Sequence, residues 1–394
     1  MPEVRPFVGL FYDPAVAGPL EKLTAPPYDL ISPDDQARLY RASPYNIVRL
    51  DLGKDEPGDS ASDDKYTRAA AYLSAWRSEG VLSPTREPCV YPYELRFQLE
   101  ARERRIRGVI AEVSLDSSTG TIVPHERTMP GPVRDRLRLL RNVQANLSPI
   151  YTVFAGPAPE LSHILDTTMK ELPRAEVTDE TGTTHTLWAT AEHTDAIAHA
   201  VKDRILMIAD GHHRYTVALA YQDEMQQRRG PGPWDSMMML IVDAGSEDPP
   251  VLPIHRVARN DTGPAGTSGR VVRDLAEVLA SVRDEDLTYG TVRWEDGNVV
   301  HRVASLNGEP PTVRALHDSV LDVLPDLGLR FIADVVAAER AVLDRSASVA
   351  YVLPPTKVDR VWSLVRAGEK MPQKSTYFWP KPRTGLVIRP FLPD

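Results

Sequence analysis

Three consecutive side chains that can donate hydrogen bonds follow an Asp-Gly pair near the middle of the chain. They lie in the segment IADGHHRYTVA, residues 208–218, and the group consists of Asp210, Gly211, His212, His213 and Arg214. Residues 205–209 are apolar and predict a buried strand, and the apolar spacing over residues 211–228 predicts a helix. The first turn of a helix has unpaired N–H groups at the positive end of the helix dipole, so this junction favours binding of phosphate.

Asp210 and Gly211 are expected to shape this junction. Asp is a preferred N-cap because its carboxylate accepts the unpaired N–H groups, and Gly allows a ligand close to the backbone. The plainer interpretation is a capped helix whose two histidines are solvated or satisfied by ordinary hydrogen bonds. A zinc site is disfavoured, because adjacent helical histidines point about 100° apart and the sequence lacks His-x-x-x-His and paired-cysteine spacings.

A second polar group lies in PHERT, residues 124–128, between a predicted strand and a predicted helix. Glu126 is a candidate general base, and His125 and Arg127 are candidates for orienting a substrate or binding phosphate. The alternative is an ordinary polar loop. We expect PHERT to approach Asp210 in space, because a polyphosphate needs donors at both of its ends.

The helix predicted over residues 134–147 is rich in arginine. Arg134, Arg138 and Arg141 share one face and Arg136 is offset from it. Such a row is usually a solvated face. In an acidic protein it could instead supply the local positive field that attracts a polyphosphate.

A third group precedes an aromatic run near the C-terminus, in MPQKSTYFWPK, residues 371–381. Lys374 could meet a phosphate as a point charge, with Ser375 and Thr376 as donors. The alternative is a packed aromatic segment with a solvated lysine. This is not a Walker A loop, because the Gly-rich approach to the lysine is missing.

Composition limits the classes of protein that these groups could serve. The chain has 394 residues, of which 42% are hydrophobic and 26% charged, as expected for a folded protein of two or three domains. The net charge of −9 argues against a general nucleic-acid binder. Cys89 is the single cysteine, the N-terminus lacks the apolar run of a signal peptide, and no stretch of about 18 apolar residues occurs. These features predict a cytoplasmic protein without a membrane span.

Strands and helices are expected to alternate through the middle of the chain, which predicts a mixed α/β fold. The expected strands cover residues 89–98, 105–115, 150–154, 183–188, 205–209 and 236–242, the first two as a hairpin. The expected helices cover residues 65–79, 134–147, 161–172, 192–203, 211–228, 318–324, 331–343 and 358–367. We divide the chain into an N-terminal α/β region (1–155), a phosphate-binding core (156–262) and a C-terminal α/β region (263–394).

Seven sequence blocks together resemble a known family. In chain order they are APPYD, NIVRLDLGK, PHERT, RLRLLRNVQANLSPIY, ADGHHRYTVAL, LPIHR and MPQKSTYFWPK. This set resembles the family catalogued as domain of unknown function 1015 over nearly the whole chain. Within it, ADGHHRYTVAL is similar to the phosphate-binding box of the ParB/sulfiredoxin superfamily. The resemblance implies a ParB/sulfiredoxin-like nucleotide-binding core with α/β additions at both ends.

The branches of that superfamily differ in residues that can be compared with this sequence. Sulfiredoxins require a cysteine just after the box glycine, where this chain has His212. ParB-type proteins require a helix-turn-helix and a basic surface, and neither is evident. Free-serine kinases carry a closely similar Asp-Gly-His-His-Arg run with an acidic catalytic base. The resemblance therefore implies a kinase that converts free L-serine to O-phospho-L-serine with ATP, ADP or pyrophosphate.

Roles follow from this interpretation. Glu126 accepts the hydroxyl proton, Asp210 is the other candidate base or a metal ligand, and His212 completes the expected catalytic set. The expected phosphate-binding residues are Gly211, His213, Arg214, His125, Arg127, Arg136, Arg141, Lys374, Ser375 and Thr376. Mg²⁺ is expected as the cofactor, carried mainly by the donor.

The expected partners are the phosphoryl donor and a hydroxyl amino acid, without nucleic acid or membrane, and a homodimer is allowed. Two rival functions stay open. One is a nucleotide-binding regulatory protein without turnover, and the other is a hydrolase of phosphate esters.

Overall fold

The computed structural model describes residues 2–60, 62–115, 120–260, 263, 267–324 and 326–391, and these residues form two compact units. Unit 1 comprises Met1–Val123, Thr128–Asp248 and Pro380–Asp394. Unit 2 comprises Pro124–Arg127 and Pro249–Trp379. The three-region division expected from the sequence stays a prediction, and its boundary at residue 262 lies outside the described residues.

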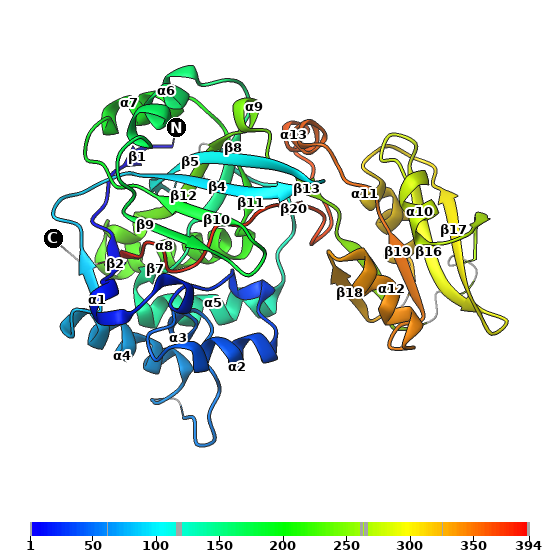
Figure 1. Cartoon of the computed structure of the whole chain (residues 1–394), viewed down its shortest axis with the longest axis horizontal. Helices are drawn as coiled ribbons and strands as arrows, with labels where there is room; N and C mark the ends of the chain where they lie inside the picture. Colours follow the sequence, from blue (N-terminus) through cyan, green and yellow to red (C-terminus); the bar gives the residue numbers. More distant parts are fainter. Residues whose placement is uncertain are drawn as a thin grey trace. The chain divides into compact units, whose positions relative to one another are not determined.

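Unit 1 is built on a mixed sheet with nine strands in its described residues (Figure 1). The order is β6-β11-β8-β12-β5-β4-β10-β9, with β1 paired to β5; β12 is parallel to β8 and antiparallel to β5. The strands are β1 (Val4–Arg5), β4 (Tyr91–Leu99), β5 (Arg102–Ser114), β6 (Ile122–Pro124), β8 (Ile150–Phe154), β9 (Ala175–Thr178), β10 (Thr184–Leu187), β11 (Leu206–Asp210) and β12 (Ser236–Asp243). Two short strand pairs accompany it, β2 (Leu10–Tyr12) with β3 (Leu82–Pro84) and β7 (Ala145–Asn146) with β21 (Arg389–Pro390).

Helices cover both faces of this sheet, with α6 and α7 on one side and α5 and α8 on the other (Figure 1). The α-helices of unit 1 are α1 (Pro14–Ala17), α2 (Pro33–Ala42), α3 (Val48–Asp51), α4 (Lys65–Ser78), α5 (Pro130–Val143), α6 (Pro159–Thr168), α7 (Thr194–Val201), α8 (His212–Arg229) and α9 (Ala244–Glu247). The 3₁₀ turns are η1 (Leu20–Lys22), η2 (Tyr28–Leu30) and η3 (Pro233–Asp235). None of the helices in the described part of the chain is long and apolar enough to cross a bilayer.

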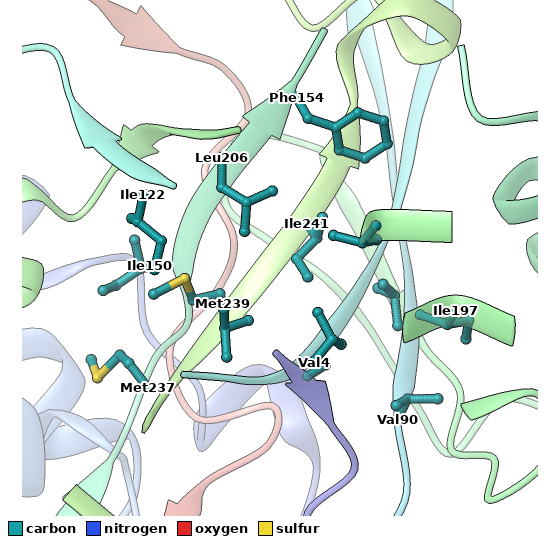
Figure 2. Close-up of a cluster of buried hydrophobic side chains, with 14 of the residues drawn as sticks. Val4, Val90, Ile122, Ile150, Phe154, Ile197, Leu206, Met237, Met239 and Ile241 are labelled. Carbon is teal, nitrogen blue, oxygen red and sulfur yellow. The ribbon is translucent and has the colours of Figure 1, made fainter. Parts of the chain in front are cut away.

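The central strand β12 explains why the core forms here. Every residue of its sequence SMMMLIVD is buried, as expected for a strand covered on both faces. Met239 and Ile241 pack with Ile150 of β8 and with Ile197 of α7 in one buried cluster (Figure 2). The strand that carries Asp210 is therefore held two positions from β12 in the most buried part of the sheet.

The last residues of the chain belong to unit 1 although unit 2 precedes them. Ile388 exchanges two backbone hydrogen bonds with Leu10, of 2.8 and 3.1 Å. The buried guanidinium of Arg389 donates to the Glu112 carboxylate at 2.8 Å and to Asn146 Oδ1 at 3.2 Å. This segment therefore crosses the core of unit 1 and fixes the position of Lys381, which lies close before it.

Unit 2 has its own sheet, which is antiparallel throughout, with six strands in the described residues. The order is β15-β17-β16-β19-β14-β18, and β13 pairs separately with β20. The strands are β13 (Val251–Leu252), β14 (His255–Ala258), β15 (Arg270–Val272), β16 (Thr288–Glu295), β17 (Asn298–Ser305), β18 (Leu329–Ile332), β19 (Val349–Val352) and β20 (Tyr377–Phe378). The helices are α10 (Leu275–Ser281), α11 (Thr312–Leu316), the π-helical turn η5 (His317–Leu321), α12 (Val335–Leu343) and α13 (Val358–Arg366).

The predicted mixed α/β class is confirmed, whereas the ParB/sulfiredoxin-like core stays a prediction. The hairpin appears as β4 and β5, and the strand–helix junction at Asp210 appears as β11 and α8. The helix predicted over residues 134–147 instead ends at Val143, because Gln144 adopts a left-handed backbone with φ of 49°. The helix predicted over residues 331–343 starts late, because its first residues pair in β18 with β14.

We predict that Ile388→Ala will lower the free energy of unfolding of unit 1 by about 2–5 kcal/mol, the range for removing a buried aliphatic side chain. Ile388 is fully buried. The measurement is urea unfolding followed by circular dichroism. Leu172→Ala is the control, since Leu172 is 94% exposed and its truncation should change stability by less than about 0.5 kcal/mol. Equal effects of the two substitutions would show that the C-terminal segment contributes nothing to the core.

Candidate functional site

The junction between β11 and α8 has the geometry expected for binding an anion. Gly211 is the N-cap of α8 and has a left-handed backbone with φ of 99°, which favours glycine. A Cβ atom at Gly211 would lie 3.1 Å from the Arg214 guanidinium, so a side chain there would crowd that group. The prediction that Asp210 caps the helix is wrong, because Asp210 is the last residue of β11 and its carboxylate binds two cations instead.

The Asp210 cluster, which we define as Asp29, Asp210, Arg214 and Lys381, is a set of paired charges in unit 1. One Asp210 oxygen lies 2.7 Å from Arg214 Nη2 and the other 2.6 Å from Lys381 Nζ. Asp29 Oδ2 lies 3.3 Å from the same lysine nitrogen. The side chains of Lys381, Arg214 and Asp210 are 8%, 11% and 12% exposed. Charges at this depth interact strongly and are costly to leave unpaired.

Arg214 is held from a second direction by the segment before β8. Its Nη1 donates to Ser148 Oγ at 2.7 Å and to the carbonyl oxygen of Pro149 at 2.5 Å. A guanidinium with bonds on both terminal nitrogens has a fixed plane. Its orientation is therefore set before any ligand binds.

Arg136 is a second buried cation near Arg214. It donates to the backbone and carboxylate of Asp51, at 2.5 and 3.1 Å, and lies 4.3 Å from the centre of the Tyr28 ring. Both arginines line a cavity of about 50 Å³, together with Asp51 and Ser148 among other residues. Burial, reinforced by Asp29 and opposed by Arg136 and Arg214, raises the pKa of Tyr28 to about 12. Tyr28 is therefore a neutral hydroxyl at physiological pH.

The two histidines of α8 differ in environment. His212 is buried in the first turn, and His213 is half-buried. The backbone N–H of Met129 donates to His213 Nε2 at 3.0 Å, so in the neutral ring the proton lies on Nδ1. This contact ties the start of α8 to the N-cap residue of α5.

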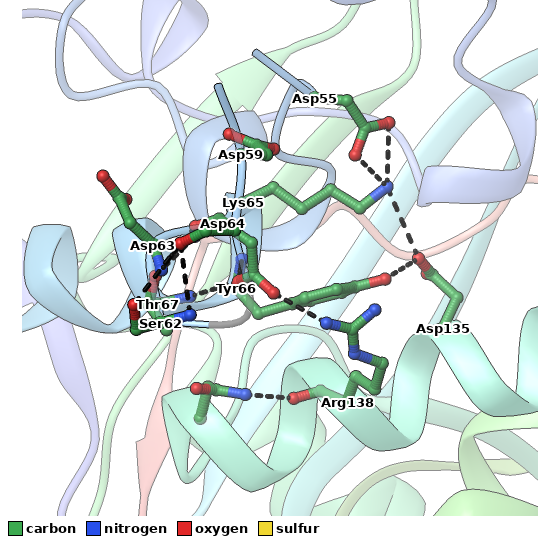
Figure 3. Close-up of polar contacts among 12 residues, drawn as sticks. Asp55, Asp59, Ser62, Asp63, Asp64, Lys65, Tyr66, Thr67, Asp135 and Arg138 are labelled. Carbon is green, nitrogen blue, oxygen red and sulfur yellow. Dashed lines mark hydrogen bonds and ion pairs between the residues drawn. The ribbon is translucent and has the colours of Figure 1, made fainter. Parts of the chain in front are cut away.

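The other predicted arginines of α5 pair with carboxylates elsewhere in unit 1. Arg138 binds Asp64 at 2.7 Å, next to Tyr66 and Asp135 (Figure 3). Arg141 binds Glu224 at 2.7 Å, which lies about 18 Å along α8 from its first residue at 1.5 Å per residue. The structure therefore brings Arg136, but not Arg141, towards the start of α8.

The Glu126 cluster, which we define as His125, Glu126, Arg256 and residues 374–376, lies in unit 2 and joins PHERT to MPQKST. Glu126 Oε2 accepts from the backbone N–H of Lys374 at 3.0 Å. Its Oε1 accepts from the N–H groups of Ser375 and Thr376, at 3.0 and 2.8 Å, and from the Thr376 hydroxyl at 2.8 Å. Lys374 has φ of 53°, and this left-handed residue turns three successive N–H groups towards one point. We call the N–H groups of Lys374, Ser375 and Thr376 the nest.

His125 and Arg127 flank Glu126 but differ in burial. His125 is fully buried, and its Nε2 lies 2.7 Å from Thr376 Oγ1 and 3.6 Å from Glu126 Oε1. Arg127 is exposed. The Ser375 hydroxyl, expected to be a phosphate donor, donates to the carbonyl oxygen of Pro372 at 2.7 Å.

The predicted set lacked the acidic residue Asp29 and two basic residues of the site, Lys381 and Arg256. Lys381 is the second lysine of MPQKSTYFWPK, and Arg256 is the arginine of LPIHR. Arg256 is fully buried and donates to the carbonyl oxygens of Ile254 and Lys374, at 2.6 and 2.9 Å. Burial lowers the pKa of Arg256 to about 10, which leaves it charged at neutral pH. Both belong to blocks that carry the family resemblance, and that was the signal available in the sequence.

The chain belongs to the family described as "Protein of unknown function (DUF1015)". The family model matches residues 4–316. A comparison with curated proteins finds no significant match.

Solved structures give distant similarities to this DUF1015 protein. A free serine kinase in complex with AMP is 13% identical, with a TM-score of 0.37, over 68% of this chain and 86% of that one. A conserved hypothetical protein from Pyrococcus furiosus is 13% identical, with a TM-score of 0.37, over 73% of this chain and 93% of that one. SbnI with C-terminal truncation, from Staphylococcus aureus, is 11% identical, with a TM-score of 0.35, over 68% of this chain and 81% of that one.

The blocks of this DUF1015 protein gather into two groups. APPYD, ADGHHR and the final Pro-Lys meet in the Asp210 cluster, whereas PHERT, LPIHR and MPQKST meet in the Glu126 cluster. Glu126 and Asp210 lie in different units, so the expected approach of PHERT to Asp210 stays a prediction. In the described part of the chain, no three His, Cys, Asp or Glu side chains come together to hold a metal ion.

We predict that Asp210→Asn will lower the free energy of unfolding by about 3–5 kcal/mol, because it leaves two buried cations without their shared carboxylate. Added phosphate should recover part of this loss by replacing the missing negative charge. Thermal unfolding in phosphate and in chloride of equal ionic strength measures both effects. Asp59→Asn is the matched control, since Asp59 pairs with Arg68 at the surface and should change little. A variant as stable as wild type in chloride would contradict the prediction.

We predict that protonation of His255 destabilises unit 2 below pH 6.5. Burial, with a smaller contribution from Arg256, lowers the pKa of His255 from 6.5 to about 4. The unfolded chain therefore binds the proton first, and stability should fall between pH 6.5 and pH 4 by on the order of 3 kcal/mol. His255→Gln keeps an acceptor for the Leu353 N–H, which His255 Nδ1 accepts at 3.1 Å, and does not titrate. Unfolding free energies of both proteins across this range should diverge, and parallel curves would exclude this contribution.

Proposed function

We propose that this DUF1015 protein is a phosphotransferase that holds a phosphoryl donor at the start of α8 and transfers phosphate to a hydroxyl acceptor. The acceptor proposed is free L-serine, with O-phospho-L-serine as the product. One observation carries the proposal: Arg214 and Lys381 are buried on separate oxygens of Asp210, beside the N-terminus of an 18-residue helix.

Phosphoryl transfer needs mainly positioning and charge neutralisation. A guanidinium of fixed orientation suits two oxygens of one phosphate, and an ammonium group suits any of them. The helix dipole adds positive potential at the same end. Asp210 holds both cations in place before a ligand binds, so their positions are fixed in advance.

The phosphoryl donor is proposed to be ATP, ADP or pyrophosphate. A chain of phosphates can be oriented by several hydrogen-bond donors whose positions are fixed. Mg²⁺ enters this proposal with the donor. It keeps several waters and prefers phosphate oxygens to a protein cage, so few protein ligands are needed. Asp210 is an unfavourable ligand for it while both of its oxygens bind cations.

Two carboxylates are candidates to accept the hydroxyl proton, Glu126 and Asp210. Glu126 accepts at least four hydrogen bonds in this conformation. It can act as a base only after some of these are exchanged. This observation favours, as the second candidate function, a nucleotide-binding regulatory protein that uses the same anion site without turnover.

We predict that ³¹P NMR will detect O-phospho-L-serine when the protein is supplied with L-serine, Mg²⁺ and ATP, ADP or pyrophosphate. Arg214→Ala should lower kcat/KM and weaken donor binding, each by at least about tenfold, because a charge-assisted donor is lost. Glu126→Gln should lower kcat by roughly 10²–10⁴-fold with little change in donor affinity. Arg228→Ala is the matched control, as a largely exposed arginine at the far end of α8.

Three outcomes separate the candidate functions. Conversion of a hydroxyl amino acid supports the phosphotransferase. Tight binding of a donor without conversion of any hydroxyl amino acid contradicts it and identifies the regulatory protein. Release of inorganic phosphate without an acceptor identifies the phosphate-ester hydrolase.

A further inference from the structure

The nest in unit 2 is an anion site that the chain fills with its own carboxylate. Its three successive N–H groups and the Thr376 hydroxyl all donate to Glu126. Successive N–H groups around a left-handed residue form the concave shape that binds phosphate in many proteins. Here that shape comes from residues 374–376, and its occupant comes from a residue almost 250 positions earlier in the chain.

Arg256 increases the affinity of the nest for an anion. Its guanidinium donates to the carbonyl oxygens of Gln373 and Lys374, at 3.3 and 2.9 Å. The same short segment therefore points carbonyl groups at a buried cation and N–H groups at a carboxylate. Hydrogen bonds in such a chain polarise one another, and the fixed charge strengthens the donors on the opposite side.

Charge balance makes the occupant exchangeable. Arg256 is fully buried, and Glu126 is one of two carboxylates whose field stabilises its charge, the other being Asp322. Withdrawal of Glu126 alone would leave Arg256 poorly compensated, which is costly. Exchange of Glu126 for another anion keeps the balance. The Glu126 side chain is only 10% exposed, so an external anion must displace it to reach the nest.

We propose that the nest is a binding site for an external oxyanion, a phosphate group in the first place, which displaces the Glu126 carboxylate. Phosphate offers more acceptor oxygens than a carboxylate to the same four donors. The displaced Glu126 then regains its acceptor capacity. The proposal rests on unit 2 alone and does not require the phosphotransferase activity.

The test compares two variants that remove the same charge. Glu126→Ala empties the nest, whereas Glu126→Gln keeps a side chain of the same size in it. Binding of inorganic phosphate to the full-length protein is measured by isothermal titration calorimetry at constant ionic strength. We expect Glu126→Ala to bind phosphate at least about tenfold more tightly than both wild type and Glu126→Gln. Equal phosphate affinity of the two variants would show that loss of the Glu126 charge alone explains any increase in affinity, and would overturn the proposal.

Acetate is titrated in parallel to distinguish a site for phosphate groups from a site for carboxylate groups. Tighter binding of phosphate than of acetate identifies a phosphate site, and the reverse order identifies a carboxylate site and overturns the assignment to phosphate. Arg214→Ala in the Glu126→Ala background should leave the phosphate affinity of the nest unchanged. Unchanged affinity would show that phosphate binds at the nest and not at the Asp210 cluster. The proposal for the nest and the proposed function can therefore fail independently.

Wild-type protein provides a measurement that does not depend on the folding of a variant. Phosphate should shift the amide resonances of Lys374, Ser375 and Thr376 in ¹⁵N NMR spectra, and chloride of the same ionic strength should not. Absence of these shifts at about 100 mM phosphate would overturn the proposal.

Discussion

The Asp210 carboxylate is the interaction on which the candidate site in unit 1 depends. It joins the end of a core strand, the first turn of α8 and the C-terminal segment, through Arg214 and Lys381. Each of these cations is nearly buried, so loss of their shared carboxylate would leave both of them poorly compensated. The position of Lys381 is set in turn by the segment that runs from there to Ile388 through the core.

Unit 2 uses the same principle with the charges reversed. There the buried cation Arg256 holds the carbonyl groups of a short segment whose N–H groups hold Glu126. In unit 1 a carboxylate positions two cations, and in unit 2 a cation positions an anion-binding backbone. Both arrangements place paired charges in a low dielectric, where displacement of one partner by a ligand changes the local field strongly.

Sequence patterns anticipated several elements because their causes are local. The buried strand before Asp210 and the helix after Gly211 follow from apolar spacing and from the backbone freedom of glycine. The hairpin β4–β5 follows from two β-rich runs separated by a charged turn. The expected capping by Asp210 failed because its carboxylate pairs instead with two side-chain cations. One is Arg214, four residues later in the chain, and the other is the distant Lys381.

The sequence by itself determined the mixed α/β class, the β11–α8 junction and the residue types able to bind an anion, since each depends on neighbours within a few positions. Only the tertiary structure decided which of those residues meet. Lys381 joins Asp210, Arg141 pairs with Glu224 away from the helix start, and Glu126 is held by backbone groups of residues 374–376. Pairing of this kind joins chain segments that lie between 83 and about 250 residues apart, and no local pattern records it.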